Sequence, residues 1–138
     1  MVLLDSVRQA LTSGHLAHLV TLNQDGSPQV TIVWIGLDGD EIVCAHIPNH
    51  QKLKNIRRDP RVALSIETGG KTGALDNYLV INGRARITEG EAPEMLNQLP
   101  QIYIGPGTQF LPDTSPPGYI THITVESIHG VGLWGKGH

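Results

Sequence analysis

The feature that most constrains the fold is a repeated alternation between short runs rich in Val, Ile and Leu and clusters of turn-forming residues. Residues 15–22 and 28–36 form two such runs, and residues 23–27 between them include Asn, Asp and Gly. A third run follows at residues 41–47, after the turn sequence at 38–40. β-Branched runs separated in this way are typical of antiparallel strands joined by hairpins. The first third of the chain is therefore predicted to be a β-meander.

The rest of the chain adds further strands. Residues 61–68 and 77–90 predict a fourth strand and a long fifth strand on either side of a glycine-rich loop at 69–76. Residues 105–118 are too rich in Pro and Gly for regular structure and are predicted to form a surface loop, before residues 119–135 end the chain as one or two strands. Closure removes exposed strand edges. We therefore expect a mostly β fold, a six-stranded antiparallel split β-barrel.

Three short helices complete the prediction. Val2–Ser13 places its apolar residues on one face, and residues 51–58 place Leu53 and Ile56 on one face before Pro60 ends the pattern. A third helix, of about two turns, is predicted between Pro93 and Pro100. With 138 residues the chain is long enough for one core and too short for two, so residues 1–138 are expected to form a single domain.

Composition restricts the setting in which the protein works. Hydrophobic residues make up 39% and charged residues 17%, which excludes a disordered chain, and no stretch approaches the roughly 20 apolar residues that cross a membrane. Cys44 is the one cysteine, and Asp5 and Arg8 lie where a secretory signal would need an apolar run. A reduced, cytoplasmic location is the expectation.

Several catalytic motifs are excluded by their context. The sequence GGKTG at 69–73 has Ser65 where a phosphate-binding loop needs glycine, and a strand is predicted after it instead of a helix. His15 and His18 are three residues apart in an extended run, so they point to opposite faces and do not share a metal. Cys44 lies within an apolar strand and is predicted to be a buried small residue. No hydrolytic triad and no metal site are predicted.

The charge distribution indicates one anion site. The window from Lys52 to Arg61 carries a net charge of +4, whereas the other 128 residues carry −7. A strand ends near His46 and a helix begins near His50, so the free amides at the start of that helix and Lys52 in its first turn are suited to a phosphate. The alternative is a solvated helix in which an arginine pairs with Asp59. A nucleic-acid surface is not expected, because the remaining surface is acidic and only six residues are aromatic.

The segments DGSPQVTIVW, EIVCAHI, HQKLKNIRRDPRVALSI and NYLVINGRARI resemble the split β-barrel flavin and deazaflavin oxidoreductases of the pyridoxamine 5′-phosphate oxidase-like superfamily. The resemblance covers about residues 3 to 90 and is greatest to the branch that uses the deazaflavin coenzyme F420. It implies a homodimer with a cofactor at the interface and a small-molecule substrate. The cofactor-binding positions that it implies are Thr31, Ile32, Val33, Ala45, His46, His50, Lys52 and Tyr78.

These positions have distinct implied roles. The cofactor ring would lie along the second and third strands, against the backbone of Ala45 and His46, and its phosphate would lie at His50 and Lys52. Tyr78 would approach the ring from the dimer interface, and Trp134 could reach a partner's site. His46 or His50 would suit a proton donor at neutral pH, and no residue is assigned as catalytic.

The resemblance also favours one cofactor over another. The FMN-binding branch usually has an arginine for the phosphate where this chain has Thr31, and no Lys or Arg occurs between Arg8 and Lys52. We therefore expect hydride transfer from reduced F420 to an unsaturated or quinone-like small molecule. An FMN-dependent oxidase or reductase of the same fold is the alternative, and a non-catalytic cofactor-binding protein is a third hypothesis.

Overall fold

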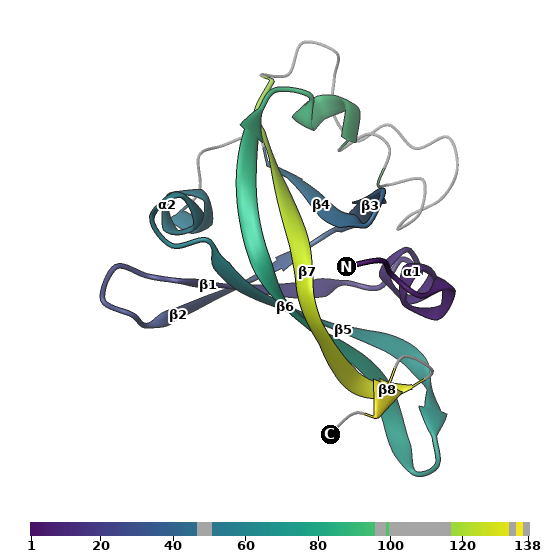
Figure 1. Ribbon diagram of the computed structural model, residues 1–138. Helices are drawn as coiled ribbons and strands as arrows, with labels where there is room; N and C mark the ends of the chain where they lie inside the picture. The colour runs from purple at the N-terminus through teal and green to yellow at the C-terminus, as the bar shows by residue number, and fades with distance from the viewer. Residues whose placement is uncertain (47–50, 96–98, 100–116, 133–134, 137–138) are drawn as a thin grey trace.

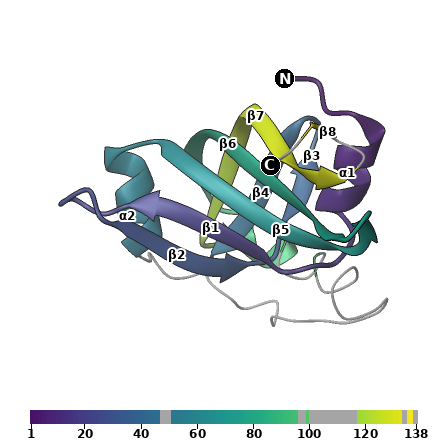
Figure 2. The ribbon, with the colours of Figure 1, turned by 90° about the horizontal axis from the view of Figure 1, so that it is seen from below.

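A computed structural model describes residues 1–46, 51–95, 99, 117–132 and 135–136 of the chain. The elements are α1 Asp5–Leu11, β1 Ala17–Leu22, β2 Pro28–Val33, β3 Gly36–Asp38, β4 Glu41–His46, α2 Gln51–Arg58, β5 Arg61–Thr72, β6 Leu75–Glu89, β7 Tyr119–Gly132 and β8 Gly135–Lys136. Residues 92–95 and 99 are also helical. The strands curl around one core, α1 packs at one end and α2 at the other (Figures 1 and 2).

The strands form one antiparallel sheet in the order β2-β1-β5-β6-β7-β4-β3, and β8 pairs with β7 beside this path. The prediction of mostly β structure is confirmed, whereas the predicted six-strand count is not: the sheet has eight strands and is not closed within the described residues. Two short strands, Gly36–Asp38 and Gly135–Lys136, extend the set by pairing with the ends of β4 and β7. No strand pairing joins β2 to β4 among the described residues, so the sheet stays open there.

The glycine-rich segment differs from the predicted loop. β5 continues to Thr72 and β6 begins at Leu75, so the expected loop at 69–76 is mostly a strand hairpin with a tight turn at its tip. Gly69 and Gly70 have φ values of 80° and 75°, which let β5 bulge between Glu67 and Lys71. A strand follows the segment, as predicted.

The structure agrees with the three predicted helices to different extents. α1 occupies Asp5–Leu11, a shorter span than Val2–Ser13, and α2 occupies the expected residues 51–58. The third helix is described at residues 92–95 and 99, and the rest of its predicted span lies outside the described residues, as does most of the predicted loop at 105–118. None of the described helices is long and apolar enough to cross a membrane.

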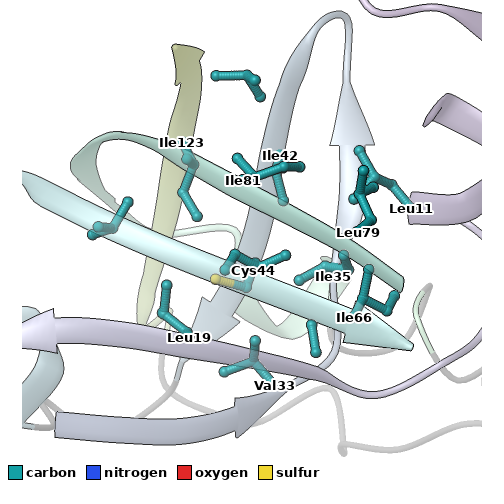
Figure 3. Packing of buried hydrophobic residues seen from close by; sticks show 14 of the residues in the cluster. Leu11, Leu19, Val33, Ile35, Ile42, Cys44, Ile66, Leu79, Ile81 and Ile123 are labelled. Carbon is teal, nitrogen blue, oxygen red and sulfur yellow. The ribbon is translucent and has the colours of Figure 1, made fainter. Parts of the chain in front are cut away.

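The core consists almost entirely of aliphatic side chains contributed by every long strand. Figure 3 shows Leu19, Val33 and Ile35 in one cluster with Ile42 and Cys44 from β4 and Ile81 from β6. Cys44 is fully buried, as predicted. Because residues from both sides of the opening share this core, β2 and β4 lie against the same core although no strand pairing joins them within the described residues.

Candidate anion and cofactor site at the sheet opening

The inner face of β2 provides one wall of the opening. Thr31 and Val33 pair with Leu19 and Ala17 of β1, both fully buried, so the two side chains point inward together as strand parity predicts. The hydroxyl oxygen of Thr31 is buried and makes no hydrogen bond with the described part of the protein. A buried hydroxyl without a partner is costly, and it marks a position where a ligand can complete the structure.

The second half of β4 provides the opposite wall. β3 pairs with Glu41, Ile42 and Val43 only, so the outer edge of Cys44 and Ala45 has no strand partner within the described residues. The side chains of Cys44 and His46 are buried, and His46 Nε2 lies 3.1 Å from the hydroxyl oxygen of Thr121. Unpaired strand edges present backbone N–H and C=O groups that a planar ligand can bind.

Lys52 lies in the first turn of α2, which packs against β1 and β6. Its side chain is only 8% exposed, and it forms no hydrogen bond or ion pair with any described residue. Burial lowers the pKa of Lys52, and the nearby thiol of Cys44 is the one group that opposes this shift. Burial also raises the pKa of Cys44 to about 12, so the thiol is neutral at physiological pH and cannot balance the ammonium.

A polar cluster fixes α2 against the β1–β2 hairpin. Asn55 is fully buried, and its Nδ2 donates to Thr21 Oγ1 at 3.1 Å, to Asn23 Oδ1 at 2.9 Å and to Gln29 Oε1 at 3.3 Å. Its Oδ1 accepts from Gln51 Nε2 at 2.9 Å. Gln29 lies on the same inward face of β2 as Thr31, and Lys52 lies one helical turn before Asn55. The cluster therefore holds the Lys52 turn of α2 beside the inner face of β2.

Sequence reasoning missed Asn55, although a signal for it exists. Lys52, Leu53, Asn55 and Ile56 are the buried residues of α2, and Asn55 interrupts the apolar stripe formed by Leu53 and Ile56. A polar residue within the buried stripe of a helix indicates a hydrogen-bonded anchor. Its partners come from three separate segments, and no local pattern in the sequence identifies them.

The predicted site residues divide between two faces. Thr31 and Val33 lie on the inner face of β2, His46 is buried at the end of β4 beside Ala45, and Lys52 lies near Cys44 of β4. Ile32 instead lies on the outer face of the sheet and is 60% exposed. Tyr78 also lies there, lining a cavity of about 480 Å³ with His18, Val20, Val30 and residues 65–67. His50 and Trp134 lie outside the described residues.

The arginines that follow Lys52 contact protein groups, unlike Lys52 itself. Arg61 pairs with Asp59 at 2.7 Å, as the solvated-helix alternative predicts for an arginine in this window. Arg58 donates to the carbonyl oxygen of Leu22 and to Asn55 Oδ1, and Arg57 stacks over the ring of Tyr119 at 5.2 Å. Lys52 is thus the buried cation of the window, and it lies at the opening.

The histidines near the N-terminus show no sign of a shared ligand. His15 precedes β1 and its Nδ1 lies 2.7 Å from Ser13 Oγ, whereas His18 lies on the outer face of β1. Within the described residues, no cluster of three His, Cys, Asp or Glu side chains has the spacing of a metal site.

The fold and the opening define a class of protein, and comparison with known proteins agrees with it. The family model described as pyridoxamine 5′-phosphate oxidase matches residues 3–132, so the chain belongs to that family of flavin- and deazaflavin-binding oxidoreductases. The resemblance stated from the sequence is thereby confirmed. No curated protein matches the chain significantly.

Solved structures show the same fold. An F420 reductase is 26% identical, with a TM-score of 0.71 over 88% of this chain and 94% of that one. A conserved hypothetical protein from Mycobacterium tuberculosis is 25% identical, with a TM-score of 0.71 over 94% and 85% of the two chains. A FAD-binding protein from Mesorhizobium loti is 20% identical, with a TM-score of 0.65 over 91% and 92%.

Proposed function

We propose that this protein is an F420-dependent oxidoreductase that transfers a hydride from the reduced deazaflavin to an unsaturated or quinone-like small molecule. The observation that carries the proposal is the side chain of Lys52, which is largely buried and has no counter-ion among the described residues. A largely buried cation without a counter-ion is disfavoured, so its presence here is best explained by an anionic ligand. The phosphate of the cofactor would supply the missing charge.

The residues around Lys52 support a deazaflavin more than FMN. Thr31 provides a hydroxyl where a guanidinium would be needed to share a compact phosphate, and Arg58 and Arg61 are engaged by protein groups. The similarity to an F420 reductase, at 26% identity over most of both chains, points the same way. Lys54, exposed on α2, and Arg57 beyond it would lie along the path of the cofactor's charged tail.

The proposed cofactor would supply the hydride chemistry, and the protein would orient the cofactor ring and exclude water from it. The hydroxyl of Thr31 and the edge of β4 at Cys44 and Ala45 would bind polar atoms of the ring. Val33 and the aliphatic core behind it exclude water from the inner side of the opening. Since hydride transfer needs no nucleophile from the protein, positioning by these groups would provide most of the rate acceleration.

The proposal includes a homodimer formed through the outer face of β1 and β2. Val30 and Ile32 are 59% and 60% exposed beside the cavity that Tyr78 lines. Adjacent exposed aliphatic side chains on a sheet are a usual mark of an interface. In such a dimer, Ile32 and Tyr78 would act on the partner's cofactor, which accounts for their position away from Lys52. Light scattering should give a dimer, and Ile32→Arg should give a monomer, whereas Arg84→Glu on exposed β6 should not.

Cofactor titration tests the proposal directly. Purified protein is titrated with F420, with FMN and with the phosphate-free 8-hydroxy-5-deazariboflavin, following absorbance and fluorescence. We expect F420 to bind most tightly, and Lys52→Gln to weaken F420 at least tenfold while leaving the phosphate-free compound nearly unchanged. Preferential binding of FMN would make the protein an FMN enzyme instead.

Turnover separates an enzyme from a carrier. Protein loaded with reduced F420 is mixed with a panel of quinones, enones and tetrapyrroles, and cofactor oxidation is followed without oxygen. Acceptor-dependent oxidation supports a reductase. Tight binding with no acceptor reduced would indicate a non-catalytic cofactor-binding protein.

A further inference from the structure

The buried amide of Asn55 occupies a position at which a carboxylate would also be accommodated. Gln51 Nε2 and Arg58 Nη1 already donate to its Oδ1, at 2.9 Å and 3.5 Å. The groups that accept from its Nδ2 belong to Thr21, Asn23 and Gln29. A hydroxyl can rotate to donate, and a side-chain amide can flip to present its NH₂ group.

A carboxylate here would therefore keep its hydrogen bonds, but it would change the electrostatics of Lys52. Residues 52 and 55 are both buried on one face of α2, and side chains three residues apart on a helix are neighbours. In a largely water-excluded site, a negative charge at that separation attracts an ammonium strongly. Lys52 would then have an internal counter-ion, whereas the neutral thiol of Cys44 gives it none.

We infer that Asn55 is a specificity-determining residue, whose uncharged amide keeps the Lys52 ammonium free for an external phosphate. This inference rests on the proposed function, because it concerns the same anion site. Asn55 thus has two separable roles. Its hydrogen bonds anchor α2 to the β1–β2 hairpin, and its neutrality sets the affinity of the first turn for anions.

The test is Asn55→Asp, which preserves shape and adds one negative charge. The matched control is Asn82→Asp, the same change at an exposed position on β6. Both variants are titrated with F420 and with the phosphate-free deazaflavin. We expect Asn55→Asp to weaken F420 about tenfold and the phosphate-free compound less than twofold. Asn82→Asp should change neither. A purely structural role would weaken both compounds equally, and that result would overturn the inference, as would unchanged F420 affinity.

Arg58 provides a second arm of the experiment. Its guanidinium would pair with Asp at position 55 and reduce the field at Lys52, so Asn55→Asp/Arg58→Gln should weaken F420 further relative to Arg58→Gln alone. If Asn55→Asp does not fold, Gln29→Glu places a carboxylate in the same cluster, and we expect a smaller loss with the same selectivity for F420. Failure of the double variant or of Gln29→Glu to discriminate between the two compounds would contradict the inference.

Lys52→Gln distinguishes failure of the proposed anion site from failure of the role inferred for Asn55. If Lys52→Gln weakens F420 selectively and Asn55→Asp does not, the anion site stands and the role of Asn55 is wrong. If Lys52→Gln has no selective effect, the proposed anion site fails, and the inference about Asn55 fails with it.

Discussion

Two polar side chains buried one turn apart on α2 have opposite environments. Asn55 is fully covered and makes hydrogen bonds to β1, to the following turn, to β2 and to its own helix. Lys52 is almost as well covered, yet it makes no hydrogen bond or ion pair with the described residues. Both polar atoms of the Asn55 amide are hydrogen-bonded, whereas the charge of Lys52 has no counter-ion among the described residues.

The difference separates a structural requirement from a functional one. A satisfied buried amide stabilises one arrangement of the segments that it joins, because breaking any bond leaves a buried partner unpaired. An ammonium without a counter-ion lowers the stability of the unliganded fold, and it contributes favourably only when an anion is bound. The contrast predicts that substitutions at the two positions change stability in opposite directions.

The largest effect on stability is expected at Asn55. Asn55→Ala should lower the free energy of unfolding by about 3 kcal/mol, because it removes the buried hydrogen bonds that join α2 to Thr21, Asn23 and Gln29. Urea unfolding followed by circular dichroism measures the change. Lys54→Ala, exposed on the same helix, is the control and should stay within about 0.5 kcal/mol of the parent. A loss below about 1 kcal/mol would show that Asn55 does not anchor α2.

Lys52→Met should act in the opposite direction and raise the free energy of unfolding by about 1 kcal/mol while abolishing selective F420 binding. Burial lowers the pKa of Lys52 from its ordinary value of 10.5, so the charged form is penalised in the folded state. The penalty is complete below the lowered pKa and disappears as pH rises through it towards 10.5. The gain should therefore be largest near neutral pH and should shrink at alkaline pH in urea titrations.

A gain from Lys52→Met that does not change between pH 7 and pH 10 would mean that the ammonium is not the source of the penalty. A loss of stability would indicate that the aliphatic part of Lys52 packs usefully, or that the charge has a partner, and the comparison with Asn55 would not hold.

Much of the fold was predictable because it depends on local signals. The runs of β-branched residues and their turn clusters located the long strands, and Leu53, Ile56 and Pro60 located α2 and its end. The short strands Gly36–Asp38 and Gly135–Lys136 were not predicted, since each owes its pairing to a neighbour brought close by the fold. The opening between β2 and β4 was not predicted either. The alternation of apolar and polar residues does not show whether two edge strands of a sheet pair with each other.

The candidate site was predictable in part. Helix position and charge identified Lys52, and strand parity placed Thr31 and Val33 on one face. Parity also places Ile32 opposite Thr31, but it does not show which face of β2 is the inner one. That choice depends on the core side chains of β1 and β4, so the division of the predicted residues between two faces needed the structure.

His122 is an intermediate case between Asn55 and Lys52. Its Nε2 lies 2.8 Å from Thr88 Oγ1, whereas its Nδ1 is buried without a hydrogen bond, 3.9 Å from Glu41 Oε1. Burial is the main cause that lowers the pKa of His122, and Arg86 adds to it. The charges of Glu41, Asp38 and Glu91 oppose the shift.

A lowered pKa at His122 predicts sensitivity to acid. The unfolded state takes up the proton first, so stability is complete above the ordinary pKa of 6.5 and is lost as pH falls from there to the lowered value. His122→Gln should remove this loss, keeping a bond to Thr88 without a titrating ring. Melting temperatures at pH 7.5 and 5.5 should differ by about 2–5 °C less in the variant than in the parent. An equal difference in both proteins would assign the acid sensitivity to other groups.

The smallest effect is expected at Thr31, where the comparison can be repeated with a matched pair on neighbouring strands. Thr21 and Thr31 both point inward, but Thr21 Oγ1 is bonded to Asn55 and Gln29, and Thr31 Oγ1 has no partner among the described residues. Thr21→Val should cost about 1–2 kcal/mol, because it removes a buried hydroxyl that accepts from Asn55 and donates to Gln29. Thr31→Val should be neutral or stabilising by about 0.5 kcal/mol. If the hydroxyl of Thr31 awaits the cofactor, the same variant should bind F420 several-fold more weakly, and unchanged affinity would remove Thr31 from the site.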